Sequence, residues 1–74
     1  MADILLLARR GTLKTHIMYH CNLSFAQTKK HLDILLTTGL LNQQSPQYVT
    51  TSRGLEFIEL YKKLSAVAKL NANT

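Results

Sequence analysis

The sequence predicts a small, mainly α-helical domain that contains one short β-hairpin. Its 74 residues are enough for a single domain, which we expect to span residues 1–74. Gly11 and Gly39 each follow a predicted helix and are typical of helix ends. Between residues 40 and 50, two short strand-like runs lie on either side of Gln44–Pro46, which predicts a hairpin.

The first predicted helix covers residues 3–10 and ends at Gly11, with two arginines in its last turn. Its three consecutive leucines, Leu5–Leu7, cannot all face one core. We therefore expect this helix to be buried on more than one side.

A second helix is predicted over residues 13–20, with Thr12 as its N-cap. Apolar spacing at i, i+4 predicts its inward side, which consists of Leu13, Ile17 and either Met18 or Cys21.

Ser24 predicts the start of a third helix over residues 25–38, which stops at Gly39. Gln27 stands three residues after Ser24, the spacing of a capping box. Only a short turn separates this helix from the second one, and such a pair is typical of a helix-turn-helix.

The strands of the hairpin are predicted at residues 40–43 and 47–50. Thr51 then caps a long last helix over residues 52–70, and residues 71–74 are expected to fray. This order of elements predicts a winged helix-turn-helix, with a three-helix core, a wing and a long C-terminal helix for dimerisation.

With these elements defined, the chain resembles the archaeal winged helix-turn-helix DNA-binding proteins, including small regulators of Sulfolobus-type archaea and their viruses. The segments that carry the likeness are KTHIMYHCNLSFAQTKKHLDILLTTGLL (residues 14–41) and YVTTSRGLEFIELYKKL (residues 48–64). They share with this group a Ser-capped helix, a Gly-Leu-Leu exit into the wing and a Thr-x-x-Gly opening of the last helix.

Two features depart from this group. Its members usually have an aliphatic residue where Thr28 stands, so that this core contact is weaker or hydroxyl-bonded here. The wing has no Lys or Arg between Asn42 and Val49, so its glutamines, such as Gln44, can reach phosphates only as neutral donors.

At about 100° per residue, the third helix has an apolar side and a polar side. The residues predicted to face the core are Thr28, Leu32 and Leu35, flanked by Phe25, His31 and Leu36. The residues predicted on the opposite side are Ala26, Lys30 and Asp33, with Gln27 and Lys29 at its edges. Such a polar side is also typical of a solvated helix without a ligand.

The resemblance implies that the first two turns of this helix enter the major groove of DNA. Gln27 can form two hydrogen bonds with an adenine edge, and Lys30 can reach guanine or phosphate. Ala26 is small enough for close approach to a thymine methyl group, and Ser24 stands at a positive helix end suited to phosphate.

Lys14 and Arg53 stand at the starts of the second and last helices, and we expect both near the DNA side as phosphate contacts. Together with the wing, the predicted DNA-binding residues are Ser24, Ala26, Gln27, Lys29, Lys30, Lys14, Arg53 and Gln44.

The last helix carries two apolar stripes. One contains Phe57, Ile58, Tyr61, Leu64 and Ala68, and the other contains Leu60, Leu64 and Val67. Because a helix that packs only on its own domain needs one stripe, the second predicts a homodimer. The predicted dimer contacts are Leu5, Leu6, Leu60, Leu64 and Val67. The alternative is a monomer with an exposed apolar C-terminus.

The composition favours nucleic acid as the partner, since the formal net charge is +5 and the sequence pI is about 9.7. The longest apolar run, Ile4–Ala8, is far shorter than the roughly 20 residues that cross a bilayer. Residues 1–3 lack the basic start of a signal peptide. We expect a cytoplasmic, nucleoid-associated protein, in the host cytoplasm if it is viral.

No catalytic site, cofactor or small-molecule substrate is expected, because the sequence has no glycine-rich phosphate loop and no nucleophile–base grouping. His16 and His20 have a spacing that can bind zinc, with Cys21 adjacent. Without a third placed ligand, we expect no metal.

The sequence therefore predicts a homodimer that binds double-stranded DNA sequence-specifically and regulates transcription. One alternative is an architectural protein that coats DNA with little preference, which needs only charge. The other is a winged-helix module that binds proteins.

Overall fold

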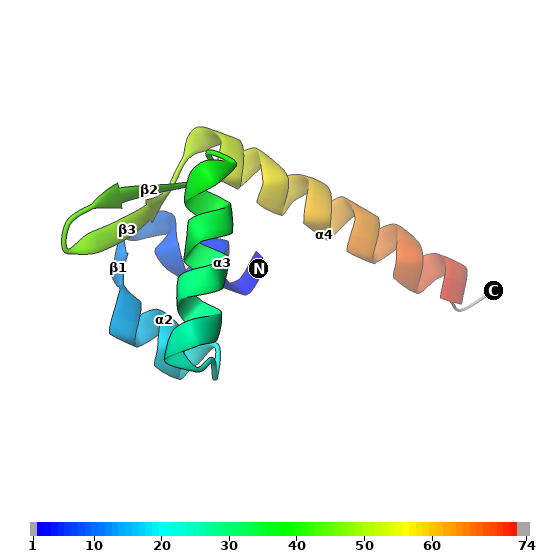
Figure 1. Ribbon diagram of the computed structural model, residues 1–74. Coiled ribbons are helices and arrows are strands. Elements are labelled where there is room, and N and C mark those ends of the chain that lie inside the picture. Colours follow the sequence, from blue (N-terminus) through cyan, green and yellow to red (C-terminus); the bar gives the residue numbers. More distant parts are fainter. Residues whose placement is uncertain (1, 73–74) are drawn as a thin grey trace.

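The computed structural model describes the backbone of residues 2–72 and the side chains of residues 2–67 (Figure 1). Along the chain, the elements are α1 (Ala2–Leu7), the 3-10 turn η1 (Ala8–Arg10), β1 (Thr12–Leu13), α2 (Lys14–His20), α3 (Phe25–Thr37), β2 (Leu41–Gln44), β3 (Gln47–Thr50) and α4 (Ser52–Ala72). The predicted architecture, mainly helical with a wing, is confirmed.

The sheet has three antiparallel strands in the order β1-β3-β2, and not only the two of the predicted hairpin. Thr12 does not cap α2, because it pairs with Tyr48 in the sheet, and Leu13 precedes α2 without a side-chain cap. Strand alternation turns Thr12 inward and Leu13 outward, so the predicted core position of Leu13 is also wrong. A second partner for β3 satisfies backbone groups that an edge strand would leave unpaired.

The first predicted helix, residues 3–10, is divided into α1 and the 3-10 turn η1, and the remaining boundaries lie within two residues of the predicted ones. Gly11 and Gly39 have φ angles of +93° and +77°, the backbone conformation that glycine adopts most readily where a helix ends. α4 extends to Ala72, past the predicted end at residue 70. Residues 73 and 74, part of the tail predicted to fray, lie outside the described residues.

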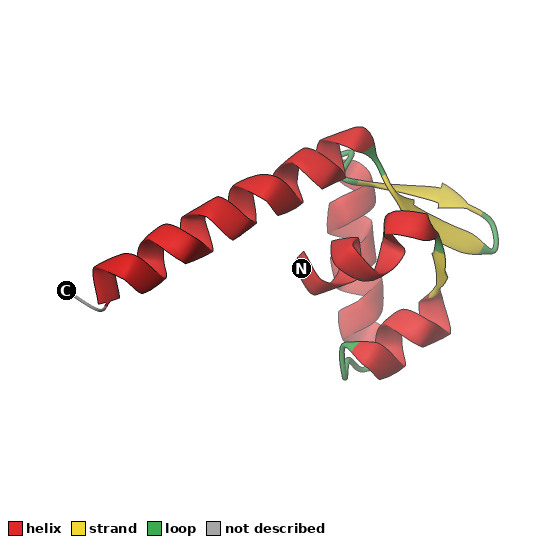
Figure 2. Ribbon diagram, turned by 180° about the vertical axis from the view of Figure 1, so that it is seen from behind, coloured by secondary structure: helices red, strands yellow, loops and turns green. Residues whose placement is uncertain are grey.

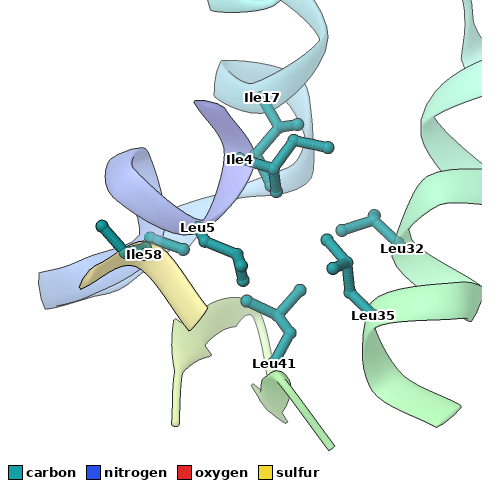
Figure 3. Packing of buried hydrophobic residues seen from close by; sticks show 8 residues of the cluster. Ile4, Leu5, Ile17, Leu32, Leu35, Leu41 and Ile58 are labelled. Atoms are coloured by element: carbon teal, nitrogen blue, oxygen red, sulfur yellow. The ribbon is translucent and has the colours of Figure 1, made fainter. Parts of the chain in front are cut away.

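One hydrophobic core joins the helices to the sheet (Figure 3). Its buried members are Ile4, Leu5, Ala8, Ile17, Leu32, Leu35, Leu41 and Ile58. Burial of each large aliphatic side chain contributes about 1.5–3 kcal/mol to stability. In Figure 3, Leu32 and Leu35 point from α3 into this cluster, and they thereby fix which side of α3 faces solvent.

Leu5 is completely buried in this core. The prediction that Leu5 contacts a second subunit is therefore wrong, because its side chain has no surface to offer. The Thr50 hydroxyl donates a hydrogen bond to the Leu5 carbonyl (2.6 Å) and so joins β3 to α1 across 45 residues of sequence.

The junction between the wing and α4 explains the Thr-x-x-Gly pattern. The Thr51 hydroxyl accepts a hydrogen bond from the Gly54 N–H (3.1 Å), as predicted for the cap, and donates one to the Gly39 carbonyl (2.6 Å). A Cβ atom at position 54 would collide with the backbone carbonyl of Leu40. Gly54 thus lets the start of α4 pack directly against the segment that follows α3.

Beyond this junction, α4 projects away from the rest of the domain (Figures 1 and 2). The Cα radius of gyration is 13.4 Å, compared with about 11 Å for a compact chain of this length. Within the first predicted stripe, Ile58 is buried, whereas Phe57, Tyr61 and Leu64 are exposed. The side chain of Ala68 lies outside the described ones. The first stripe therefore contacts its own domain mainly through Ile58.

Candidate nucleic-acid interface

The start of α3 is fixed by the predicted capping box. The Ser24 Oγ accepts a hydrogen bond from the Gln27 backbone N–H (3.1 Å), and the Gln27 Oε1 accepts one from the Ser24 backbone N–H (3.0 Å). The buried Thr28 hydroxyl donates to the Ser24 carbonyl (2.8 Å), so this core position is hydroxyl-bonded. The first turn of α3 therefore needs no outside partner to hold its shape.

The solvent side of α3 carries the predicted polar residues. Ser24, Ala26, Gln27, Lys29 and Lys30 are all exposed, and we name this set the α3 face. Among the side chains that the structure describes, one ion pair is formed, between Lys62 and Glu59 of α4. Lys29 and Lys30 take no part in this ion pair, and they lie near a helix N-terminus, which is itself positive.

Gln27 has a structural role in addition to its predicted contact with DNA. Its Oε1 accepts a hydrogen bond from the Ser24 N–H, while its Nε2 has no hydrogen-bond partner among the described residues. Two hydrogen bonds to one adenine edge require both ends of the amide. Gln27 must therefore release the capping bond before it can read adenine in that way.

Lys14 lies next to the α3 face, because its Nζ atom sits 4.0 Å from the centroid of the Phe25 ring. Phe25 is 60% exposed, so the prediction that it flanks the core is wrong. Phe25 is the first residue of α3. Sequence periodicity cannot reveal its exposure, because the neighbouring helix decides how far each flank is covered.

Arg53 lies at the other end of α3. Its guanidinium approaches the position of Gly39, just after the last turn of the helix. With 13 residues in α3, this end is about 20 Å from Ser24. Arg53 and Lys14 therefore lie near opposite ends of α3, and their placement on one DNA side stays a prediction.

The wing is the β2–β3 hairpin, with Gln44 paired to Gln47 next to the turn. Figure 1 shows it reaching out to one side of α3. The Gln43 Nε2 donates a hydrogen bond to the Tyr48 hydroxyl (3.4 Å), while residues 42–47 are all exposed. The wing thus offers amide donors and no cation.

The histidine rings of α2 lie close together, with the centroids of His16 and His20 5.8 Å apart. Within the described residues, no three His, Cys, Asp or Glu side chains are grouped so that they could hold a metal ion. Cys21 is half-buried, and burial, followed by the negative charge of Asp3, raises the pKa of its thiol.

α4 carries a second exposed surface of different character. Phe57, Leu60, Leu64 and Val67, named here the α4 stripe, follow one another at intervals of three, four and three residues. Leu60, Leu64 and Val67 are 59%, 68% and 53% exposed. Leu6 of α1 is also partly exposed. Of the predicted dimer contacts, all except Leu5 thus have accessible surface.

Comparison with known proteins agrees with this geometry. A family model described as winged helix-turn-helix matches residues 1–69, so the chain belongs to the winged helix-turn-helix family. A domain of this family implies DNA as its partner and is typically not an enzyme. No curated protein matches the chain. Within residues 2–72, none of the helices combines the length and hydropathy that a membrane span requires.

Proposed function

We propose that the protein is a homodimeric regulator of transcription that binds specific sequences of double-stranded DNA, with α3 in the major groove. The observation that carries this proposal is the α3 face, where two lysines follow a helix start held by a capping box and form no ion pair with the side chains that the structure describes. The protein then acts in the cytoplasm, associated with the nucleoid, or in the host cytoplasm if it is viral.

Each residue of the interface has a role in this proposal. Lys29 and Lys14 contact phosphates, and Lys30 reaches a guanine edge or a phosphate. Ala26 permits close approach of α3 to the bases, and the amide groups after Ser24 bind a phosphate at the positive end of the helix.

The wing contributes in a different way. Gln44 and its neighbours are neutral donors, so contacts that they make to phosphates or groove edges release few counterions. Affinity from the wing is then nearly independent of salt, whereas affinity from the lysines falls steeply as salt rises.

The α4 stripe supports the dimer. Its spacing of three, four and three residues is that of the a and d positions of a coiled coil, which a second copy of the same helix complements. A 74-residue chain gains stability from such pairing, because one small core is marginal by itself. Leu6 lies outside this stripe and adds to the interface at its edge.

A two-fold dimer presents its two copies of α3 to two half-sites about 34 Å apart, one turn of DNA. Arg53 then contacts a phosphate of the DNA backbone away from the phosphate bound near Ser24, because it lies at the far end of α3.

The test is duplex binding by fluorescence anisotropy over a salt series, after selection of a preferred site from random duplexes. Three cations from each of two subunits, Lys14, Lys29 and Lys30, predict a slope of log K against log salt of about −5. The variant Gln27→Ala/Lys30→Ala should lose the advantage of the selected site, which amounts to about 1–3 kcal/mol per good base contact. Lys63→Ala, an equal loss of charge on α4, is the matched control and should retain that advantage.

The alternatives predict other outcomes. A wild-type protein that binds all duplexes equally, with the same salt dependence, is an architectural protein. A protein that binds no duplex at low salt uses its α3 face for solubility alone, and the protein-binding module becomes the better explanation.

A further inference from the structure

Phe25 is the most exposed large apolar side chain of α3, at 60% compared with 40% for Ile34. An aromatic ring can bury about 150–250 Å² when a partner covers it. In this protein the ring lies at the first position of α3, within one turn of Lys29, on the end of the helix that carries the α3 face.

A cation from the neighbouring helix holds this ring in place. The Lys14 Nζ lies 4.0 Å from the ring centroid, within the range of cation–π attraction. Lys14 is the first residue of α2 and Phe25 the first of α3, so this contact links the starts of both helices of the helix-turn-helix. The ammonium covers one face of the ring and leaves the remainder accessible to a ligand.

We propose that Phe25 is a specificity-determining residue that recognises thymine, by packing its exposed ring against the 5-methyl group in the major groove. This inference rests on the proposed DNA binding by the α3 face. Lys14 holds the ring and binds the adjacent phosphate, so the two side chains recognise a thymine together with the backbone next to it.

The chemistry of the groove favours thymine over the other bases. Its methyl group is the apolar group that base edges present in the major groove, and a phenyl ring can cover it without loss of hydrogen bonds. Cytosine carries only a hydrogen where thymine has the methyl group, so the ring gains less apolar contact there, and adenine and guanine present polar groups. A ring packed on those groups removes water and supplies no hydrogen bond in return, which disfavours them.

The experiment compares thymine with deoxyuridine, which lacks only the methyl group. Each thymine of the selected site is replaced in turn, and the dissociation constant is measured for wild type, Phe25→Ala and Phe25→Leu. At one position the wild type should bind thymine about fourfold more tightly than uracil, the value of one buried methyl group. Phe25→Ala should reduce that ratio to about one, and Phe25→Leu should give an intermediate ratio.

Tyr19→Ala is the matched control, because Tyr19 is an aromatic residue of α2 that is 89% exposed, and among the described side chains no cation is stacked on it. It should leave the thymine-to-uracil ratio unchanged. Circular dichroism of each variant checks that the helix content is retained, and the ratio within one variant does not depend on its overall affinity.

Lys14→Gln tests the second half of the inference. Loss of this cation should reduce the magnitude of the salt slope by about 0.9 per subunit. It should also lower the thymine-to-uracil ratio at the same position that responds to Phe25, since the ring is then held less firmly.

The inference is overturned if no thymine responds to Phe25, or if the ratio in Phe25→Ala equals that of the wild type. In both cases specific binding by the wild type can persist, so the proposed function stands without this contact. Absence of any duplex binding by the wild type overturns both.

Discussion

α3 and α4 both have a solvent-exposed side, but the exposed side of α3 is mainly polar and that of α4 carries a stripe of large apolar residues. α3 buries Thr28, Leu32 and Leu35 and exposes polar and cationic residues around a capped N-terminus. Within residues 52–67 of α4, Ile58 is buried, and the other large apolar side chains, including the whole α4 stripe, are exposed.

The difference shows what each surface can bind. A polar surface with unpaired ammonium groups gains by contact with a polyanion and remains well solvated without one. An apolar stripe at coiled-coil spacing gains by removal from water, and a second copy of the same helix provides a matching surface. One helix therefore suits a ligand, and the other suits self-association.

The largest expected effect comes from placing charge on the α4 stripe. In Leu60→Asp/Leu64→Asp, a dimer must bury unpaired carboxylates, which costs several kcal/mol. The dissociation constant of the dimer should rise at least about a thousandfold, and the protein should sediment as a monomer. DNA affinity should fall about 100-fold or more with the loss of the second half-site contact.

Leu55→Asp is the matched control for this charge. Leu55 is exposed on α4 but lies on the side away from the α4 stripe at about 100° per residue. It should remain a dimer by analytical ultracentrifugation. A double variant that sediments like the wild type would contradict pairing through the stripe.

A smaller effect is expected at the junction that joins α4 to the rest of the domain. Gly54→Ala forces a Cβ atom against the Leu40 carbonyl and should lower the free energy of unfolding by about 1–3 kcal/mol. Thermal or urea unfolding measures this loss. Ala66→Gly provides a contrast, because it removes a methyl group from an exposed site on α4 and should cost about 1 kcal/mol through helix propensity alone.

The next prediction separates the capping role of Gln27 from its proposed role in DNA binding. Gln27→Glu keeps an oxygen that accepts from the Ser24 N–H, so unfolding should change by only a few tenths of a kcal/mol. It removes the amide donor and adds a negative charge, so DNA binding should fall about tenfold or more. Ser24→Ala removes the oxygen that accepts from the Gln27 N–H, so it should lower the free energy of unfolding by about 1 kcal/mol. Equal DNA binding by Gln27→Glu and wild type would remove Gln27 from the interface.

The smallest effect concerns Cys21, at the end of α2. Because folding raises the pKa of this thiol, the folded state holds the proton more tightly than the unfolded state does. Its contribution to stability is present below the pKa of the unfolded thiol, about 8.5, and is lost as pH rises through the folded value. Urea unfolding between pH 7 and 10 should show a steeper loss of stability for the wild type than for Cys21→Ala. Parallel curves would show that the thiol titrates alike in both states.

The sequence alone determined the features that depend on neighbours within a few residues. The Ser24–Gln27 capping box, the helix ends at Gly11 and Gly39 and the cap at Thr51 are local hydrogen bonds or local backbone conformations. The inward side of α3 also follows from its periodicity. The archaeal or viral origin implied by the resemblance stays a prediction.

Tertiary structure decided the features that depend on distant segments. Thr12 became a strand residue because β3 lies beside it, and Leu5 became core because it joins a buried cluster with residues of distant helices and of β2. Arg53 lies at the far end of α3 from Lys14 because α4 starts there, and Phe25 stays 60% exposed although Lys14 of α2 contacts its ring. The physical reason is the same in each case: periodicity defines the sides of a helix or strand, whereas packing decides which of those sides remains in water.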